Sequence, residues 1–481
     1  MESPWSGGFE TQREELTTTL PVEGSLPSWL SGTYLLNGPG AFEVGGERLD
    51  HWFDPLAMVR RLAFEDGEVA YANRFVESRD YAFAQRHGRV RTPFPGTAPD
   101  RPLWRRLWQA LGGEFPDNPV IGITRIDGHV LAVTESPVGL ELDPETLSVV
   151  GRHDLTAGTD TDLTLAHQHY DPQERAFYNL GVTYGREPAY TLFRRPDRWE
   201  DGPAPAEPLT RVRIDRGYVP YVHSFAITER YAVVPLGPFG VSLRKLLAGS
   251  LTGGTFLDAF EGFDDRSVFV VLDRATGEHV GTVPADPFFV YHHANAYEDG
   301  DAVVLDCVAY PDARAVTGLT FPELLAEDAS APAGDLVRFR VPLSGGDVER
   351  TTLREGPMEF PTIEYGRDNG RPYDHLWVCE GGDGPLPSRV TRVDLDGGAA
   401  RSYDPGPDAY AGEAVFVPAP DGADEKTGVL LSVVNDSERS TLTVLDAETL
   451  TERARAPLPH RLPYAFHGQF YGDWTPTRSM L

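Results

Sequence analysis

Four histidine positions share a sequence context that could hold a metal ion. Each lies at the edge of an apolar, strand-like run: His167 in LTLAHQHYDP, His223 in YVPYVHSFAITERY, the pair His292 and His293 in FVYHHANAYED, and His467 in YAFHGQFYG. Side chains alternate between the two faces of a strand, so only one member of the pair can point at a given centre. The long separations exclude a local motif such as HExxH, in which two ligands share one helix face. They allow four ligands from four separate strands that meet at one point.

Three glutamates in apolar, strand-like text could complete such a site. They are Glu135 in HVLAVTESPVG, Glu359 in GPMEFPTIEYG and Glu413 in YAGEAVFVPAP. A neutral imidazole ligand usually donates its other N–H to a carboxylate or a carbonyl, and an unpaired carboxylate in apolar surroundings is costly. Any one of the three could lie in water at a strand end. Together, beside four histidines, they favour an all-histidine metal site with glutamate partners, and imidazole suits iron, zinc, copper and nickel alike.

The elements that must position these residues read as strands joined by tight turns. Residues 288–307, FFVYHHANAYEDGDAVVLDC, form an apolar run, a turn at EDGD and a second strand-like run. A related phrase, in which a strand ends in Asp before a turn and a second strand, recurs as LDPETLSVVG at Leu142, LDRATGEHVG at Leu272 and LDAETLTERA at Leu445. The resemblance of these phrases, with no long amphipathic helix between them, favours an all-β propeller over a large sandwich. The centre of a propeller would bring four strands to one axis.

Two segments interrupt the strand pattern. Residues 237–263, GPFGVSLRKLLAGSLTGGTFLDAFEGF, are apolar and rich in glycine, and a helix-like piece surrounds Trp104 and Trp108. The 237–263 insertion has two interpretations, a helical excursion that covers one face of the core, or a patch that dips into a membrane and admits a lipophilic substrate. No run of about 18 apolar residues could span a bilayer, and the first residues lack the features of a signal peptide. We therefore expect a cytoplasmic protein, with peripheral membrane contact as an option.

The charge balance is strongly acidic. There are 73 acidic and 43 basic residues, a net charge of −30, and Lys245 and Lys426 are the only lysines. This composition is typical of a halophilic protein, whose self-repulsion is screened in concentrated salt. It argues against nucleic acid as a partner, because phosphate binding needs clustered basic charge. The two cysteines, Cys307 and Cys379, lack CxxC spacing and are expected to be core residues.

Ordered motifs along nearly the whole chain resemble those of the carotenoid cleavage oxygenase family, which includes the retinoid isomerohydrolase of the eye and stilbene-cleaving dioxygenases. The motifs are LPSWLSGTYLLNGPG, DHWFDPLAMVRR, AHQHYDP, VHSFAITERYAVV, VYHHANAYEDGDAVVLDC, MEFPTIEY, GEAVFVP, GVLLSVV and FHGQF. The resemblance implies that residues 1–481 form a single domain of this type. It also implies a seven-bladed β-propeller with an axial Fe(II) and a helical and loop cap over one face.

The resemblance also implies a set of site residues. Carried over motif by motif, the iron ligands are His167 rather than His169, His223, His293 rather than His292, and His467. The glutamate partners are Glu135 for His223, Glu359 for His293 and Glu413 for His467. Aromatic residues beside the ligands could line a tunnel or pack in the core, namely Phe225, Tyr291, Phe360 and Phe466.

The implied function is that of a non-haem Fe(II) dioxygenase, in which both atoms of O₂ enter the product and no acid or base beyond the metal centre has to act. A conjugated double bond of a carotenoid or apocarotenoid would be cleaved to two carbonyl products. The motif wording is closer to the animal β-carotene oxygenases, which favours symmetric 15,15′ cleavage of β-carotene to retinal. A stilbene or another apocarotenoid is the alternative substrate. The alternative from another class is a propeller that serves only as an interaction scaffold.

Overall fold

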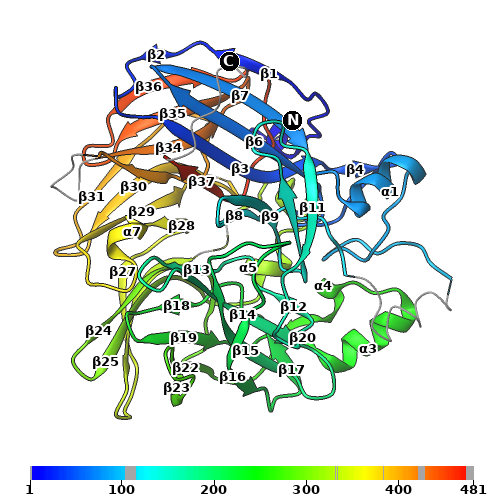
Figure 1. Ribbon diagram of the computed structural model, residues 1–481, viewed down its shortest axis with the longest axis vertical. Coiled ribbons are helices and arrows are strands. Elements are labelled where there is room, and N and C mark those ends of the chain that lie inside the picture. Colours follow the sequence, from blue (N-terminus) through cyan, green and yellow to red (C-terminus); the bar gives the residue numbers. More distant parts are fainter. Residues whose placement is uncertain are drawn as a thin grey trace.

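Antiparallel sheets arranged as blades around a common axis make up most of the protein (Figure 1). The computed structural model describes residues 3–102, 115–330, 332, 334–382, 384–420 and 428–472. The helix-like piece expected around Trp104 and Trp108 lies outside these residues. Within them, seven sheets of four to six strands form the blades, which we number along the chain. The seven-bladed propeller is therefore confirmed.

The first four blades are built as follows. Blade 1 contains β1 (Thr17–Leu20), β7 (Glu68–Phe75), β6 (Leu56–Glu65), β3 (Gly32–Ala41) and β37 (Gly468–Tyr471). Blade 2 contains β8 (Gly122–Ile126), β9 (His129–Val133), β10 (Val138–Leu142) and β11 (Val149–Asp154). Blade 3 contains β12 (Leu163–Thr164), β13 (His169–Asp171), β14 (Ala176–Thr183), β15 (Ala189–Pro196) and β16 (Glu207–Arg213). Blade 4 contains β18 (Ala226–Ile227), β19 (Tyr231–Leu236), β22 (Ser267–Asp273) and β23 (His279–Ala285).

The last three blades follow in chain order. Blade 5 contains β24 (Phe289–Asp299), β25 (Ala302–Tyr310), β26 (Asp335–Pro342) and β27 (Glu349–Arg354). Blade 6 contains β28 (Met358–Thr362), β29 (His375–Gly381), β30 (Pro387–Asp394) and β31 (Ala400–Tyr403). Blade 7 contains β32 (Tyr410–Ala411), β33 (Val415–Pro418), β34 (Gly428–Asn435), β35 (Ser440–Asp446), β36 (Glu452–Pro457) and β2 (Glu23–Gly24).

Both ends of the chain close the ring. The early strand β2 pairs with β36 of blade 7, and the late strand β37 pairs with β3 of blade 1. Figure 1 shows the consequence, since the blue first blade and the orange last blade lie side by side. This exchange joins the two ends of the ring by backbone hydrogen bonds and leaves the sheet edges there covered.

The recurring Asp phrase forms a hairpin in blades 2, 4 and 7, and each phrase is a strand, a turn and a second strand as predicted. The Asp residues of the three turns are Asp143, Asp273 and Asp446. Each Asp carboxylate accepts hydrogen bonds from the backbone N–H groups of the residues two and three positions later. The fourth residue after each Asp has a positive φ, and Gly277 occupies that position in blade 4. Short polar side chains that satisfy their own turn explain why the same phrase gives the same hairpin three times.

Short helices and one additional sheet cover one side of the core. Strands β17 (Tyr218–Pro220), β20 (Phe239–Ser242) and β21 (Phe260–Gly262) form the additional sheet, with helices α3 (Leu243–Thr252) and α4 (Phe256–Ala259) between β20 and β21. Helices α5 (Arg314–Thr317) and α6 (Phe321–Leu324) follow β25. Side chains from these elements share the largest apolar cluster with β24 and with the chain before β37. They form the helical and loop cap that was predicted.

The remaining elements lie outside the blades and the cap. They are the 3-10 helix η1 (Ser6–Phe9), the hairpin of β4 (Glu43–Val44) and β5 (Glu47–Arg48), and the helices α1 (Arg79–His87) and α7 (Tyr365–Asp368). Cys307 and Cys379 are buried free thiols in β25 and β29, as expected. Among the described residues, the helices are all too short or too polar to cross a bilayer.

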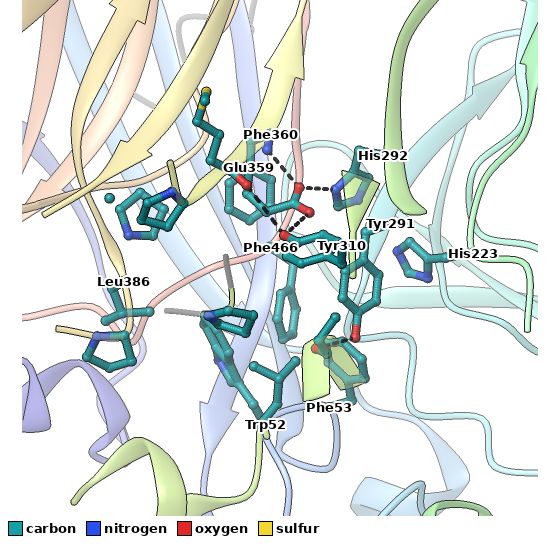
Figure 2. Close-up of a pocket in the computed structure, with 18 of the residues that line it drawn as sticks. Trp52, Phe53, His223, Tyr291, His292, Tyr310, Glu359, Phe360, Leu386 and Phe466 are labelled. Atoms are coloured by element: carbon teal, nitrogen blue, oxygen red, sulfur yellow. Dashed lines mark hydrogen bonds and ion pairs between the residues drawn. The ribbon is translucent and has the colours of Figure 1, made fainter. Parts of the chain in front are cut away.

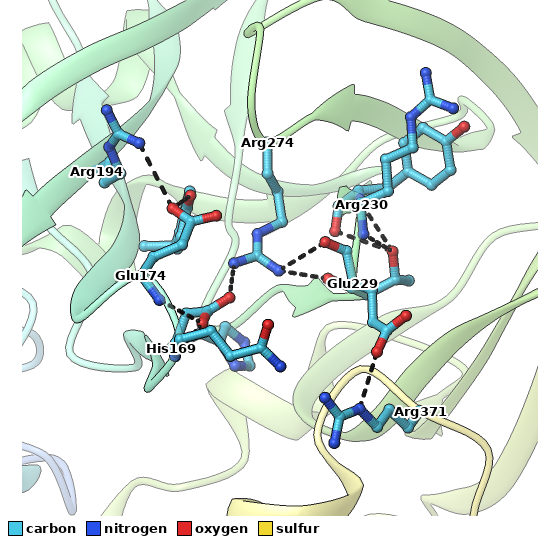
Figure 3. Close-up of polar contacts among 12 residues, drawn as sticks. His169, Glu174, Arg194, Glu229, Arg230, Arg274 and Arg371 are labelled. Carbon is cyan, nitrogen blue, oxygen red and sulfur yellow. Dashed lines mark hydrogen bonds and ion pairs between the residues drawn. The ribbon is translucent and has the colours of Figure 1, made fainter.

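A buried arginine joins blades 3 and 4 (Figure 3). The Arg274 guanidinium donates to the carboxylate of Asp171, at 2.5 Å, and to the carbonyl of Thr228, at 2.6 Å. The ring of Tyr178 lies 4.2 Å from its central carbon. A planar guanidinium suits this position because it satisfies several acceptors while its face packs on an aromatic ring. The arginine therefore fixes the relative position of the two blades that carry His167 and His223.

Candidate metal centre

Four histidines converge on the axis of the propeller. One ring nitrogen from each of His167, His223, His292 and His467 lies within 4.8 Å of the other three, and the Nε2 atoms of His167 and His223 are 3.0 Å apart. They come from four blades: His167 lies between β12 and β13, His223 precedes β18, His292 is on β24, and His467 directly precedes β37. Three of the four predicted histidines are therefore brought together as expected.

The fourth prediction was wrong, because His292 and not His293 belongs to the cluster. His293 faces away from the axis, and its Nδ1 contacts the hydroxyl of Ser224 at 2.8 Å. Alternation along β24 does divide the pair, but it does not say which member faces the axis. The register of β24 against β25 shifts on both sides of His293, and such irregularities re-aim side chains.

His169 also lies outside the cluster, as predicted. Its Nε2 is 2.8 Å from the carbonyl oxygen of Phe225, and its Nδ1 is 2.8 Å from the hydroxyl of Tyr365. Figure 3 shows His169 beside the Arg274 network. The His169 side chain therefore joins blade 3 to the chain before β18 in blade 4 and to helix α7.

A glutamate contacts the Nδ1 atom of three of the clustered histidines. The predicted pairs are present for Glu135 with His223, at 2.6 Å, and for Glu413 with His467, at 2.9 Å. Glu359 contacts His292 at 2.5 Å, so its predicted pairing with His293 was wrong (Figure 2). An Nδ1–H that donates to a carboxylate leaves the Nε2 lone pair free to face the axis.

The three glutamates come from the blades that supply no histidine. Glu135 follows β9 in blade 2, Glu359 lies on β28 in blade 6, and Glu413 lies between β32 and β33 in blade 7. Each of the seven blades therefore contributes one residue to the site. A ring of seven similar units explains how residues so distant in sequence share one centre.

Burial keeps the clustered histidines in the form that binds metals. Burial, followed by the neighbouring histidines, holds the pKa of His167 and of His292 well below the usual range. Both are therefore neutral near pH 7, and neutral imidazole is the ligand form. Burial also raises the pKa of Glu359 to about 7, against the lowering effect of hydrogen bonds from Tyr310 and the Phe360 amide.

An orphaned nitrogen indicates that these residues fit a metal ion. The Nε2 atoms of His292 and His293 are both buried without a hydrogen-bond partner among the described residues, and of the two residues His292 belongs to the histidine cluster. Buried polar atoms nearly always have a partner, and an ion on the axis would provide one. Four imidazoles with carboxylates behind three of them form a donor set that suits iron and other borderline divalent metals.

The centre lies between two cavities of different character. An apolar cavity of about 100 Å³ is bounded by His223, His292 and His467 on one side. Aromatic side chains form much of its remaining wall, namely Trp52, Phe53, Tyr291, Tyr310, Phe360 and Phe466 (Figure 2). A second cavity of about 750 Å³, with both polar and apolar walls, is bounded by His167 and His467 and also by Gln168 and Glu413.

Of the four aromatic residues noted in the sequence, three line the apolar cavity and Phe225 packs in a separate core cluster. The sequence reasoning missed Tyr310, Trp52 and Phe53. Trp52 and Phe53 lie in the DHWFDP motif, which was noted without a role for its aromatic rings. Tyr310 ends β25, and nothing in its local sequence indicates its partner in another blade.

The family model described as RPE65, retinal pigment epithelial membrane protein, matches residues 9–472. The chain belongs to this family of carotenoid cleavage oxygenases. The β,β-carotene 15,15′-dioxygenase of Mus musculus is 29% identical, over 94% of this chain and 88% of the relative. The carotenoid cleavage dioxygenase 8 homolog A of Oryza sativa subsp. japonica is 34% identical, over 96% of this chain and 87% of the relative.

Solved structures of the family show the same fold. A variant of Synechocystis apocarotenoid oxygenase has a TM-score of 0.85 and 25% identity, over 98% of this chain and 99% of that chain. Cobalt-substituted Synechocystis apocarotenoid oxygenase has a TM-score of 0.84 and 26% identity, with the same coverage. The predicted class, an oxygenase of the carotenoid dioxygenase type, is confirmed.

Proposed function

We propose that this family member is an Fe(II)-dependent dioxygenase that cleaves one conjugated double bond of a carotenoid or apocarotenoid to two carbonyl products. The observation that carries the proposal is the cluster of four histidines that opens onto an aromatic-lined, apolar cavity. An interaction scaffold would need neither the convergence of four imidazoles nor an apolar cavity beside them.

The residues that would hold the iron are His167, His223, His292 and His467. Bound there, iron would supply the activation of O₂ for addition across the double bond. Four neutral ligands leave the charge of a divalent ion uncompensated, and Glu135, Glu359 and Glu413 offset it from behind three of the rings. Those three carboxylates also keep the rings in the tautomer whose Nε2 faces the axis.

The work of the protein is to place the polyene and to exclude water. Phe360 lies against His467, with ring centroids 5.4 Å apart, and Phe466 lines the same cavity, so a flat conjugated chain beside the centre would contact aromatic faces. None of the cavity residues has to donate or accept a proton if both oxygen atoms enter the products. Placement of one double bond next to the cluster then decides where the chain is cut.

We further propose that the insertion 237–263 contacts a membrane and admits the substrate. Leu247 on α3 is 65% exposed, whereas Leu246 and Phe256 pack partly against the main core cluster. A cavity of about 760 Å³ opens between this insertion and the segment near Phe94. An exposed apolar helix beside an open cavity suits the transfer of a lipophilic molecule from a bilayer. Flotation with liposomes at high salt tests this proposal.

Symmetric 15,15′ cleavage of β-carotene to retinal is our first choice of reaction. The mouse relative is named for that cleavage, whereas the Synechocystis structures are named for apocarotenoids, which makes an apocarotenoid the second candidate. A stilbene is a third. We also propose that the enzyme works in concentrated salt, which its net charge of −30 supports, and that it is located in the cell interior. The ring closure by β2 and β37 supports a single domain over residues 1–481.

Product chromatography tests the substrate directly. The iron-loaded protein would be incubated with a panel of carotenoids, apocarotenoids and stilbenes, and the chain length of each product reports the bond that was cut. We expect retinal from β-carotene as the main product. A protein replete with Fe(II) that consumes no oxygen with any member of the panel would contradict the proposed function.

A further inference from the structure

The hydroxyl of Tyr310 contacts His292 indirectly, through the carboxylate of Glu359. Glu359 contacts His292 Nδ1 through Oε2, and the backbone N–H of Phe360 donates to the same oxygen at 2.8 Å. The other oxygen, Oε1, accepts a hydrogen bond of 2.5 Å from the hydroxyl of Tyr310 (Figure 2). The chain of contacts therefore runs from Tyr310 on β25 through Glu359 on β28 to His292 on β24.

This carboxylate needs the hydroxyl because its surroundings are apolar. Glu359 and Tyr310 line the same cavity, whose other walls are mostly aromatic and aliphatic. A buried carboxylate oxygen without a donor is costly, and among the described residues Tyr310 is the donor to Oε1. With Oε1 anchored, rotation of the carboxylate is blocked and Oε2 stays aimed at His292.

The other two glutamates show what is particular about Tyr310. Glu413 is held from behind by the backbone, because the N–H of Gly468 donates to its second oxygen at 2.7 Å. Glu135 receives the hydroxyl of Tyr221 at 2.8 Å on the same oxygen that contacts His223. Of these three glutamates, Glu359 is the one whose second carboxylate oxygen is held by a side chain, Tyr310. A single substitution can therefore remove that hydrogen bond.

We propose that Tyr310 is a positioning residue of the metal centre, whose hydroxyl orients Glu359 and through it the ring of His292. The proposal rests on the proposed function, since it assumes that His292 holds the iron. The hydroxyl and not the ring has this role, and the ring serves as cavity wall. Loss of such an outer partner weakens metal binding by about 10–100-fold in characterised sites.

The test compares two tyrosines of the same cavity. Tyr310→Phe keeps the ring and removes the hydroxyl on Glu359. Tyr291→Phe is the matched control, because the Tyr291 ring lies 5.9 Å from that of Tyr310 and lines the same cavity, but its hydroxyl donates to the carbonyl of Ala315 at 3.0 Å. Each protein would be loaded with Fe(II), and the rate of iron transfer to a chelator would be measured. Circular dichroism and Tm report whether each variant is folded.

We expect Tyr310→Phe to release iron about 10–100-fold faster than the wild type, and Tyr291→Phe to remain within about twofold. The absorption spectrum of Co(II)-loaded Tyr310→Phe should also change, since the spectrum reports the ligand geometry. Equal release rates and spectra for the wild type and a folded Tyr310→Phe would overturn the proposal.

A double-variant cycle separates action through Glu359 from a general loosening of the core. In the Glu359→Ala background, Tyr310→Phe should change the release rate by less than about twofold, because the carboxylate that Tyr310 positions is already lost. Full additivity of the two substitutions would overturn the proposal. Failure of the proposed function is a different result, in which the wild type itself binds neither iron nor cobalt at the cluster, and the inference then fails with it.

Discussion

Substitution of the two adjacent histidines on β24 should have different effects. Loss of His292 should remove the bound iron, and loss of His293 should lower the stability of the fold while the iron stays bound. His292→Ala removes one of the four histidines proposed to hold the iron and leaves Glu359 without its imidazole partner. Loss of a residue that hydrogen-bonds to a metal ligand lowers the metal affinity by about 10–100-fold. Loss of the ligand itself should therefore lower the iron affinity by at least about 100-fold, or about 2.8 kcal/mol. His293→Ala instead removes the contact with Ser224 and should lower the free energy of unfolding by about 1–3 kcal/mol while iron is retained.

Iron per chain, measured by colorimetry after desalting, and urea unfolding of the same samples check this prediction. The wild type and His293→Ala should hold about one iron per chain, and His292→Ala should hold almost none. Circular dichroism confirms that each variant is folded before its iron is counted. If His292→Ala kept its iron and His293→Ala lost it, the orientation of β24 deduced above would be refuted.

Three further predictions concern the membrane patch, the glutamates and pH. Leu247→Asp should abolish flotation with liposomes at high salt, whereas Val150→Asp, at a 58% exposed apolar position on β11, should leave it unchanged; flotation of both variants would remove the membrane proposal. Glu413→Gln should speed iron release from the loaded protein by about 10–100-fold, as measured with a chelator, and an unchanged rate would contradict a role for that carboxylate. The iron-free protein should lose stability as the pH falls below about 6.5, because histidines with lowered folded pKa values gain protons on unfolding. These are His51, His167, His169, His292, His293 and His460. The raised pKa values of four carboxyl groups, Asp54, Asp80, Glu359 and Glu364, act in the opposite direction and are outnumbered by the six histidines. A Tm that is constant from pH 8 to 5 would contradict this balance.

Local chemistry made much of the fold predictable. The Asp turn at Asp143, Asp273 and Asp446 depends on a side chain and the backbone two or three residues away, so the sequence contains the whole interaction. The same holds for the strand pairs that these turns join. The arrangement of seven such units in a ring came from the resemblance of the motifs to a known family, since no short fixed period marks the blades.

The site was predictable in its composition and not in its orientation. His223 and His467 were single candidates within their motifs, and the resemblance chose His167 over His169. It also paired His223 and His467 with the right glutamates. At His292 and His293 the alternation rule offers two equal choices, and the register shifts of β24 that settle the choice depend on pairing with β25. Tyr310 could not be found from local sequence because its partner, Glu359, lies in the next blade.

Cleavage under ¹⁸O₂ shows whether the protein is a dioxygenase, because it identifies the source of the oxygen atoms in the products. The iron-loaded protein would be mixed with β-carotene, the carbonyl products would be reduced at once to alcohols to prevent exchange with water, and their masses would be measured. We expect both products of each cleavage to carry one ¹⁸O atom, because both atoms of O₂ enter the products of a dioxygenase. Products that carry oxygen from water alone, or intact substrate with an iron-replete protein, would contradict it.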